Sequence, residues 1–256
     1  ADGTVRLSRI GSGADRAWQE PFANIPNRTL LFLPGSPTRL ARLNVARAHI
    51  VDLASGRVIN SFAFPEPYGL FQAGRSVSPD GAVMVVLVRH GAEVKCQAWT
   101  LDPVAGVTRV VDLQGAPTEP GRAIFSPRGD LVALGGNTGA TTIRLWDLKT
   151  GAPAATPLVQ DTPMVQIAGT PFRECFSPDG SRFAASSTDG VVNVWDTATG
   201  KVAHQLPPAK PRAVTLIRFN PDGTRLLTVY TGGESQLWNT STGQRAGPVL
   251  FHGGNV

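Results

Sequence analysis

The sequence predicts an all-β protein that is built from a repeated unit of four antiparallel strands. Three observations lead to this prediction. A proline-glycine turn recurs along the chain, a strand that ends in tryptophan follows it at a regular distance, and short apolar runs lie between the two motifs. No segment has the apolar spacing of an amphipathic helix of useful length.

The first motif is an apolar residue followed by a turn of the Ser-Pro-Asp-Gly type. Proline presets φ, aspartate can bind its own backbone, and glycine adopts the left-handed conformation that returns the chain into the next strand. This chemistry is typical of a tight hairpin. The motif occurs at Val77–Gly81, Phe125–Gly129, Phe176–Gly180 and Phe219–Gly223, with a degenerate copy at Phe32–Gly35.

The second motif is a strand that ends in tryptophan, followed by a glycine five places later. Clear copies are Trp146–Gly151, Trp195–Gly200 and Trp238–Gly243, weaker copies are Val51–Gly56 and Ser8–Gly13, and Trp99–Gly106 has a longer loop. The tryptophan follows the turn proline by 17 residues in the last two units. The fixed order and spacing of both motifs predict a repeat of about 45 residues.

Short strands fill the space between these landmarks. The runs 83–88, 131–134, 183–186 and 226–229 are nearly all apolar or small, which is typical of strands that are buried on both faces. The runs 143–146 and 192–195 alternate, so we expect one face of each to point inward and the other outward. Each unit therefore supplies four strands.

Four strands per period, a Ser-Pro-Asp-Gly turn and a strand that ends in Trp-Asp resemble WD40 repeats, in an array of bacterial type. The resemblance covers essentially the whole chain and implies a β-propeller of four-stranded antiparallel blades around a central channel. In this family a histidine before the first strand often bonds an Asp, a Ser or Thr, and the Trp. Asp189, Ser187 and Trp195 correspond to those three partners, but no histidine precedes their unit at the expected place.

We expect a single domain over residues 1–256, with five complete blades and a partial one. Their approximate limits are 1–22 for the partial blade and 28–64, 70–114, 120–158, 171–206 and 213–250 for the complete blades. The chain starts at the turn between the second and third strands of a blade. The strands at its two ends do not add up to one complete blade. We therefore expect further blades in a longer chain, which would form a ring of seven or more blades.

Composition and motifs exclude several function classes. The net charge is +5, but only four basic residues are lysines and none forms a dense run, so we expect no nucleic-acid binding. No apolar stretch reaches the length of a membrane span. Isolated cysteines at 96 and 175 give no disulfide framework, which fits a cytoplasmic protein. We found no phosphate loop, nucleophile elbow or metal motif, and therefore predict no catalytic residue, metal or cofactor.

The recurring aromatic and acidic residues are interpreted as parts of the repeat. An aspartate that recurs in a turn usually bonds the backbone, and a tryptophan that recurs at one blade position usually belongs to the core. This structural set comprises Trp99, Trp146, Trp195, Trp238, Asp147, Asp189 and Asp196.

A partner-binding rim is predicted from the arginines near the innermost strands. By resemblance to the family, Arg122 and Arg173 would rise at the channel mouth on the face called the top. Arg75, Arg218, Thr188 and His90 lie at nearby positions of the innermost strands or in loops of that face. Such a rim would favour carboxylates or phosphates through bidentate bonds. The alternative is that these arginines pair with acids such as Glu174 inside the blades.

These features predict a non-catalytic scaffold that binds a protein or an acidic peptide on the top face and channel rim. The alternative is a sensor or scaffold domain of a larger enzyme, such as a bacterial protein kinase. Family resemblance carries much of this expectation, because a fold does not determine a function.

Overall fold

The chain forms strands, and no helix is present in the residues that the structure describes. The computed structural model describes residues 4–8, 15–19, 29–32, 39–43, 47–64, 68–69, 77–90, 92–102, 104–118, 122–135, 141–161 and 174–251. Within these ranges, nothing has the length and apolar character of a membrane-crossing helix. The all-β prediction is confirmed.

The described strands form one two-stranded sheet and five four-stranded antiparallel sheets, which we call blades I to V. The two-stranded sheet pairs β1 (Thr4–Ser8) with β2 (Asp15–Gln19). Blade I contains β3 (Thr29–Phe32), β4 (Arg39–Leu43), β5 (Arg47–Asp52) and β6 (Arg57–Ala63). Blade II contains β7 (Tyr68–Gly69), β8 (Val83–His90), β9 (Glu93–Asp102) and β10 (Gly106–Asp112). Blade III contains β11 (Arg122–Phe125), β12 (Leu131–Gly135), β13 (Thr142–Asp147) and β14 (Leu158–Val159). Blade IV contains β15 (Glu174–Phe176), β16 (Arg182–Ser186), β17 (Val192–Asp196) and β18 (Val202–Leu206). Blade V contains β19 (Val214–Phe219), β20 (Arg225–Tyr230), β21 (Glu234–Asn239) and β22 (Leu250–Phe251).

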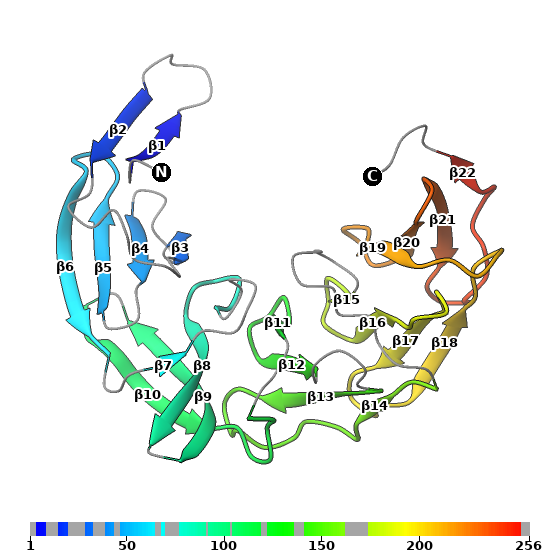
Figure 1. The fold of residues 1–256 in the computed structure, drawn as a ribbon, viewed down its shortest axis with the longest axis horizontal. Coiled ribbons are helices and arrows are strands. Elements are labelled where there is room, and N and C mark those ends of the chain that lie inside the picture. Colours follow the sequence, from blue (N-terminus) through cyan, green and yellow to red (C-terminus); the bar gives the residue numbers. More distant parts are fainter. Residues whose placement is uncertain are drawn as a thin grey trace.

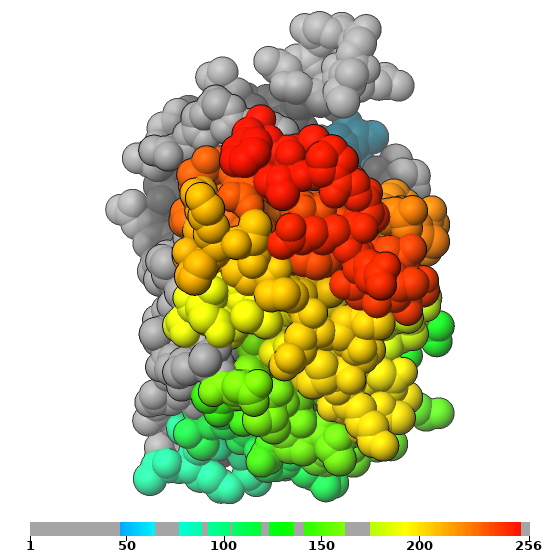
Figure 2. Space-filling view, turned by 90° about the vertical axis from the view of Figure 1, so that its right-hand side faces the viewer, coloured from blue at the N-terminus to red at the C-terminus, as the bar shows by residue number. Residues whose placement is uncertain are grey.

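The blades follow one another along an open arc, as Figure 1 shows. Strands that are consecutive in the chain are neighbours in each sheet, so every blade is a simple meander. The first strand of each blade lies on the inner side of the arc and the fourth lies on the outer side. Figure 2 shows blades III, IV and V stacked directly against one another. Five four-stranded blades and a partial one are the architecture that the repeat predicts.

Both sequence motifs form turns at the same edge of the blades. The Ser-Pro-Asp-Gly turn joins the first strand to the second, and the Ser177 hydroxyl donates to Asp179 at 2.6 Å and accepts the amide of Arg182 at 2.9 Å. The turn after the tryptophan joins the third strand to the fourth. We call this side of the blades, defined by the turns 78–81, 126–129, 177–180 and 220–223, the Pro-Gly edge. The turns between second and third strands, including 187–190 and 231–233, define the opposite edge.

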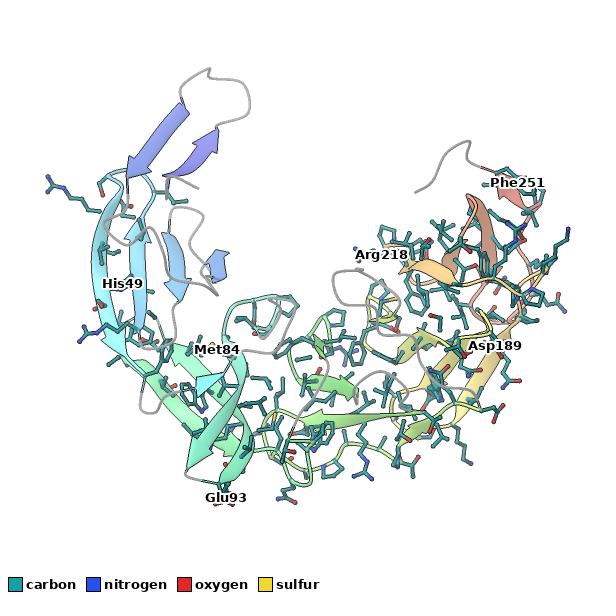
Figure 3. All side chains as sticks on the ribbon, viewed as in Figure 1. His49, Met84, Glu93, Asp189, Arg218 and Phe251 are labelled. Carbon is teal, nitrogen blue, oxygen red and sulfur yellow. The ribbon has the colours of Figure 1, made fainter. Side chains whose placement is uncertain are left out.

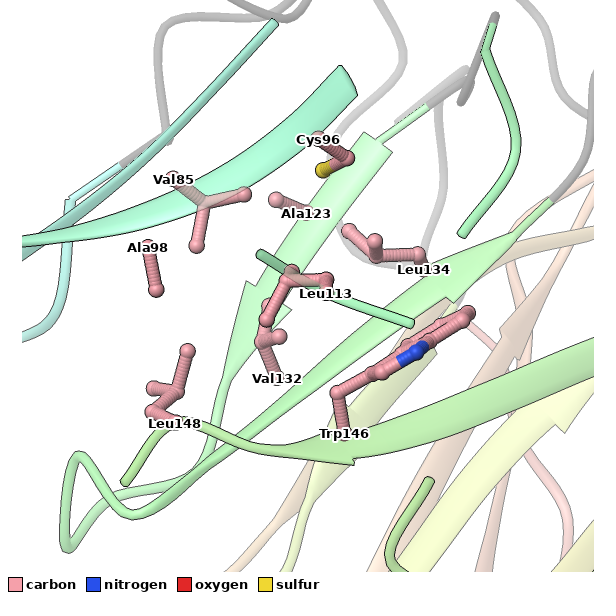
Figure 4. Packing of buried hydrophobic residues seen from close by; sticks show 9 residues of the cluster. All are labelled: Val85, Cys96, Ala98, Leu113, Ala123, Val132, Leu134, Trp146 and Leu148. Atoms are coloured by element: carbon pink, nitrogen blue, oxygen red, sulfur yellow. The ribbon is translucent and has the colours of Figure 1, made fainter. Parts of the chain in front are cut away.

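The hydrophobic core lies between the blades. Each of the four clusters of buried residues combines side chains of two neighbouring blades, and each contains one tryptophan that packs against the preceding blade. In Figure 4, Trp146 and Val132 of blade III face Val85 and Cys96 of blade II. Trp99, Trp146 and Trp195 are fully buried. A blade therefore depends on its neighbours to bury its apolar faces.

The third strand of blade IV differs from its expected pattern. The sequence predicts alternation over residues 192–195, but Val192, Asn193, Val194 and Trp195 are all buried. The reason is that blade III covers one face of β17 and blade V covers the other. In blade III the alternation holds better, because Arg144 is exposed between Ile143 and Leu145.

The glycine of the second motif makes a close contact between blades. Gly200 has a φ of +71° and lies directly against Thr156 of blade III. The Thr156 hydroxyl donates to the carbonyl of Thr199 at 2.8 Å, which ties the two blades together at this point. The glycine thus serves the turn and the blade junction at once.

The fourth strands carry features that interrupt pairing with another strand. Register shifts occur between the third and fourth strands of blades I, II and IV. In blades III and V, prolines at 153, 157 and 248 precede the short outer strand. Bulges and prolines both make a sheet edge a poor template for a further strand.

Candidate partner-binding surface

The structure brings part of the predicted rim to one edge. Thr188 lies exposed in the turn between β16 and β17, at the opposite edge. Arg122 is the first residue of β11, paired with Gly135, and His90 is the last residue of β8, paired with Glu93. Since both strand ends lie next to second-to-third turns, Arg122 and His90 belong to the same edge as Thr188.

The other arginines do not join this group in the described structure. Arg218 is exposed on β19 and pairs with Leu227, two positions before the turn 220–223. It therefore lies near the Pro-Gly edge. Figure 3 shows it on the inner side of the arc. Arg75 and Arg173 lie outside the described residues.

A hydrogen-bonded turn holds Thr188 in place. The Ser187 hydroxyl donates to Asp189, and Asp189 accepts the amide of Val191 at 3.0 Å. The expected link from this pair to Trp195 does not form, because the indole nitrogen of Trp195 has no hydrogen-bond partner among the described residues. The Ser-Asp pair thus stabilises its own turn and leaves the tryptophan to packing alone.

Arg212 is the residue of this edge that the sequence analysis missed. It lies in the loop between blades IV and V, and its carbonyl oxygen packs against Gly190, where a side chain would collide with it. Its guanidinium donates to the carbonyl of Thr231 at 3.2 Å. Arg212 therefore connects the second-to-third turns of two successive blades. The Lys-Pro-Arg sequence at 210–212 and the two glycines at 232–233 are the signals that could have drawn attention to it.

The buried carboxylate of Glu234 lies next to the Arg212 guanidinium. The Arg212 Nη1 lies 3.7 Å from the Glu234 carboxylate, whose side chain is only 8% exposed, whereas the Arg212 side chain is 34% exposed. Burial raises the pKa of the neighbouring Tyr230, and the negative charge of Glu234 raises it further. The pair thus fixes a partly exposed cation at the junction of blades IV and V.

A second cation of this edge is paired within blade II. Lys95 lies 3.5 Å from the Glu93 carboxylate and 3.8 Å from that of Asp112. Asp112 also accepts the side-chain amide of Gln97, which in turn accepts the indole N–H of Trp99 at 2.9 Å. This chain of contacts connects surface charge to the core tryptophan.

The carboxylates of the Pro-Gly edge accept hydrogen bonds from residues of their own turns. Asp147 accepts the amides of Lys149 and Thr150, and Asp196 accepts the amide and hydroxyl of Thr199. Hydrogen bonds from Ser177 and Ser181 lower the pKa of Asp179 to about 2. A carboxyl with a pKa as low as that of Asp179 is poorly matched to proton transfer near neutral pH.

The thiol of Cys96 and the possible metal ligands are two further potential sources of chemistry among the described residues. Burial raises the pKa of the Cys96 thiol to about 12, which keeps it protonated and unreactive. In the described ranges, histidine, cysteine and acidic side chains form no group of three that could hold a metal ion.

One repeat of the chain matches the model of a known family. The model of the WD domain, G-beta repeat, matches residues 173–196, which contain β15, β16 and β17. The WD repeat-containing protein VIP3 of Arabidopsis thaliana is 29% identical over 100 residues, which are 37% of this chain and 31% of that protein. The match thus spans less than a third of the relative's length.

Solved structures share the fold at low sequence identity. KlHsv2 with loop 6CD replaced by a Gly-Ser linker superposes with a TM-score of 0.56 at 15% identity, over 93% of this chain and 71% of that chain. The crystal structure of Kluyvelomyces marxianus Hsv2 superposes with a TM-score of 0.52 at 12% identity, over 93% and 70%. At these identities the likeness concerns the arrangement of the blades.

Proposed function

We propose that this chain is a non-catalytic scaffold that binds protein partners on the opposite edge of its blades, because one of its repeats matches the WD domain model and its fold is that of a propeller. Protein interaction is the general role of such propellers. The specific surface is our proposal, and it comprises Thr188, Arg212 and the strand ends at Arg122 and His90.

One observation supports this surface above the others. Arg212 is held at a blade junction by three contacts, namely Gly190, the Thr231 carbonyl and the Glu234 carboxylate, and its side chain remains one-third exposed. A cation that is fixed before binding loses little side-chain freedom when it meets a partner. The remaining guanidinium donors suit a carboxylate, so we propose that the partner offers an acidic segment.

Charge reversal on each edge tests the proposal. The probe is a fluorescein-labelled pool of peptides in which half of the positions are Asp or Glu, measured by fluorescence anisotropy. Lys210 is exposed in the loop that carries Arg212, two residues before it, so its replacement adds to the charge change while the Arg212–Glu234 pair stays in place. The variant Arg122→Glu/Lys210→Glu should weaken binding by about tenfold or more, as expected for the loss of charge-assisted contacts. The matched control is Lys149→Glu/Lys201→Glu, which makes the same charge change in two exposed turns of the Pro-Gly edge. Unchanged binding by the first variant, or an equal loss in the control, would refute the proposed surface.

A further inference from the structure

A groove between blades III and IV opens at the Pro-Gly edge, away from the surface proposed above. Its volume is about 550 Å³, which is in the range of sites that bind small ligands. It is lined by the Pro-Gly turns of both blades and by the turn that follows Trp146. The groove thus lies where two successive repeats meet.

Part of the groove is apolar and firmly supported. Leu131, Ala152 and Ala154 line it, and each is only partly exposed. Leu131 and Ala154 also pack against the buried cluster that contains Trp195. A hydrocarbon chain in the groove would therefore lie on a rigid apolar surface.

Three carboxylates and one cation line the same groove. The acids are Asp130, Asp147 and Asp179, and the cation is Arg128. Asp130 accepts the Ser126 hydroxyl through one oxygen, and Asp147 accepts its turn donors through one oxygen, so each keeps a second oxygen without a partner among the described residues. No ion pair within the described part of the chain involves any of the three. The groove therefore carries more negative than positive charge among the residues that the structure describes.

In blade IV an arginine lies across the sheet from the equivalent carboxylate one repeat later. Leu131 pairs across the sheet with Asp147, and at the same register position Arg182 pairs with Asp196. The charge of Arg182 contributes to lowering the pKa of Asp196, after the hydrogen bonds from Thr199. The next groove, between blades IV and V, is lined by this Arg182 and by Arg225. Blade IV thus supplies its own guanidinium where blade III has leucine.

We propose that the groove between blades III and IV binds a lysine or arginine side chain of a partner polypeptide. The methylene stem would lie on Leu131, Ala152 and Ala154, and the charged head would approach Asp130 and Asp147. Long basic side chains characteristically bury their stems while their heads stay near water and anions. A metal ion fits less well, since no three acidic, histidine or cysteine side chains of the described ranges converge as ligands would. The basic side chain of the partner would supply the positive charge near Asp147 that Arg182 supplies near Asp196 in blade IV.

The test measures binding of a defined peptide by amide chemical shifts. The probe is acetyl-Gly-Ala-Lys-Ala-Gly-amide at millimolar concentrations, with peptides that carry Arg or norleucine at the centre. The Lys and Arg peptides should shift the amides of Ala152, Ala154 and Gly180 in a saturable manner. The norleucine peptide should bind at least about fivefold more weakly, because it keeps the stem but loses the charge. Absence of saturable shifts with Lys and Arg, or equal binding of norleucine, would overturn the proposal.

Variants then locate the charge. Asp130→Asn/Asp147→Asn should weaken binding of the Lys peptide by at least about fivefold while keeping the turns, since Asn239 already fills the equivalent of Asp147 in blade V and accepts the backbone amides of the same two turn positions. Leu131→Arg, which copies blade IV, should also abolish binding. The matched control Asp196→Asn removes the same charge one repeat later, outside the groove, and should bind like the parent protein. An equal loss in this control would count against the site. The opposite edge is unchanged in all of these proteins, so this result is independent of the proposed scaffold surface.

Discussion

Gly200 lies so close to Thr156 that a Cβ atom on Gly200 would be 2.5 Å from the Thr156 carbonyl oxygen. We predict that Gly200→Ala destabilises the protein well beyond the cost of its backbone conformation. Alanine at positive φ costs about 1 kcal/mol, and forcing the two blades apart should add about 1–3 kcal/mol. Urea unfolding measures the sum.

Gly180 provides the matched control for this prediction. It belongs to the same blade and has a φ of +72°, but a Cβ there would meet only the Ser126 side chain at an ordinary 3.9 Å. Gly180→Ala should therefore show the backbone cost alone. Equal losses of stability in the two variants would mean that the junction contact has no energetic role.

Trp195 offers a place where stability can be gained. In blade V the Trp238 indole donates to the Thr228 hydroxyl at 2.9 Å. The Trp195 indole has no hydrogen-bond partner within the described ranges, and Ala185 occupies the position that Thr228 has in blade V. Ala185→Ser should place a hydroxyl near the indole and stabilise the protein by about 1 kcal/mol. Thermal and urea unfolding would measure the gain.

Ala184 is the matched control for the serine substitution. It is fully buried but belongs to the cluster on the other face of the sheet, shared with blade V. Ala184→Ser should bury a hydroxyl away from the indole and destabilise the protein by about 1–3 kcal/mol. A destabilising Ala185→Ser would show that the indole nitrogen is already satisfied.

Asp179 should make the stability of blade IV depend on acid pH. Its folded pKa is lowered from 3.8 to about 2, first by the Ser177 hydroxyl and then by that of Ser181. A carboxyl with a lowered folded pKa stabilises the fold above its unfolded pKa and loses that contribution as the pH falls towards 2. Ser177→Ala should raise the Asp179 pKa, as measured by carboxyl ¹³C shifts. Asp222 is the internal reference, because its pKa is lowered mainly by Thr224, and a parallel shift of Asp222 would contradict this explanation.

Cys96 should resist alkylation in the folded protein. It is 4% exposed, and burial raises its pKa to about 12. Since the thiolate is the reactive form, iodoacetamide at about pH 8 should modify Cys96 only as fast as the protein unfolds. Mass spectrometry of proteolytic peptides gives the extent at this residue. Modification at the rate found in urea would show that the cluster of Figure 4 opens readily.

The architecture was predictable because it rests on local chemistry. The turn at Ser177–Gly180 and the loop after Trp195 are specified by residues a few positions apart, and their regular recurrence predicts the blades. The burial of Asn193 was not predictable, because it depends on both neighbouring blades. The same holds for the contact of Gly190 with Arg212, which joins residues from two repeats through backbone shape. The groove lined by Leu131 was likewise missed, since a single repeat contains only one of its walls.

The sharing of each core cluster by two blades has a consequence for how such a chain can change in length. A stretch of chain from one repeat tryptophan to the next contributes to two successive blade junctions. It supplies the residues on one side of each junction. In-frame duplication of that stretch therefore adds one blade. Each apolar face of the added blade meets a face of the kind that it already packs against in the present chain. Gain or loss of whole repeats in the gene is thus compatible with an intact core, whereas a break within a repeat leaves Trp146 or Trp195 without the preceding blade that covers it.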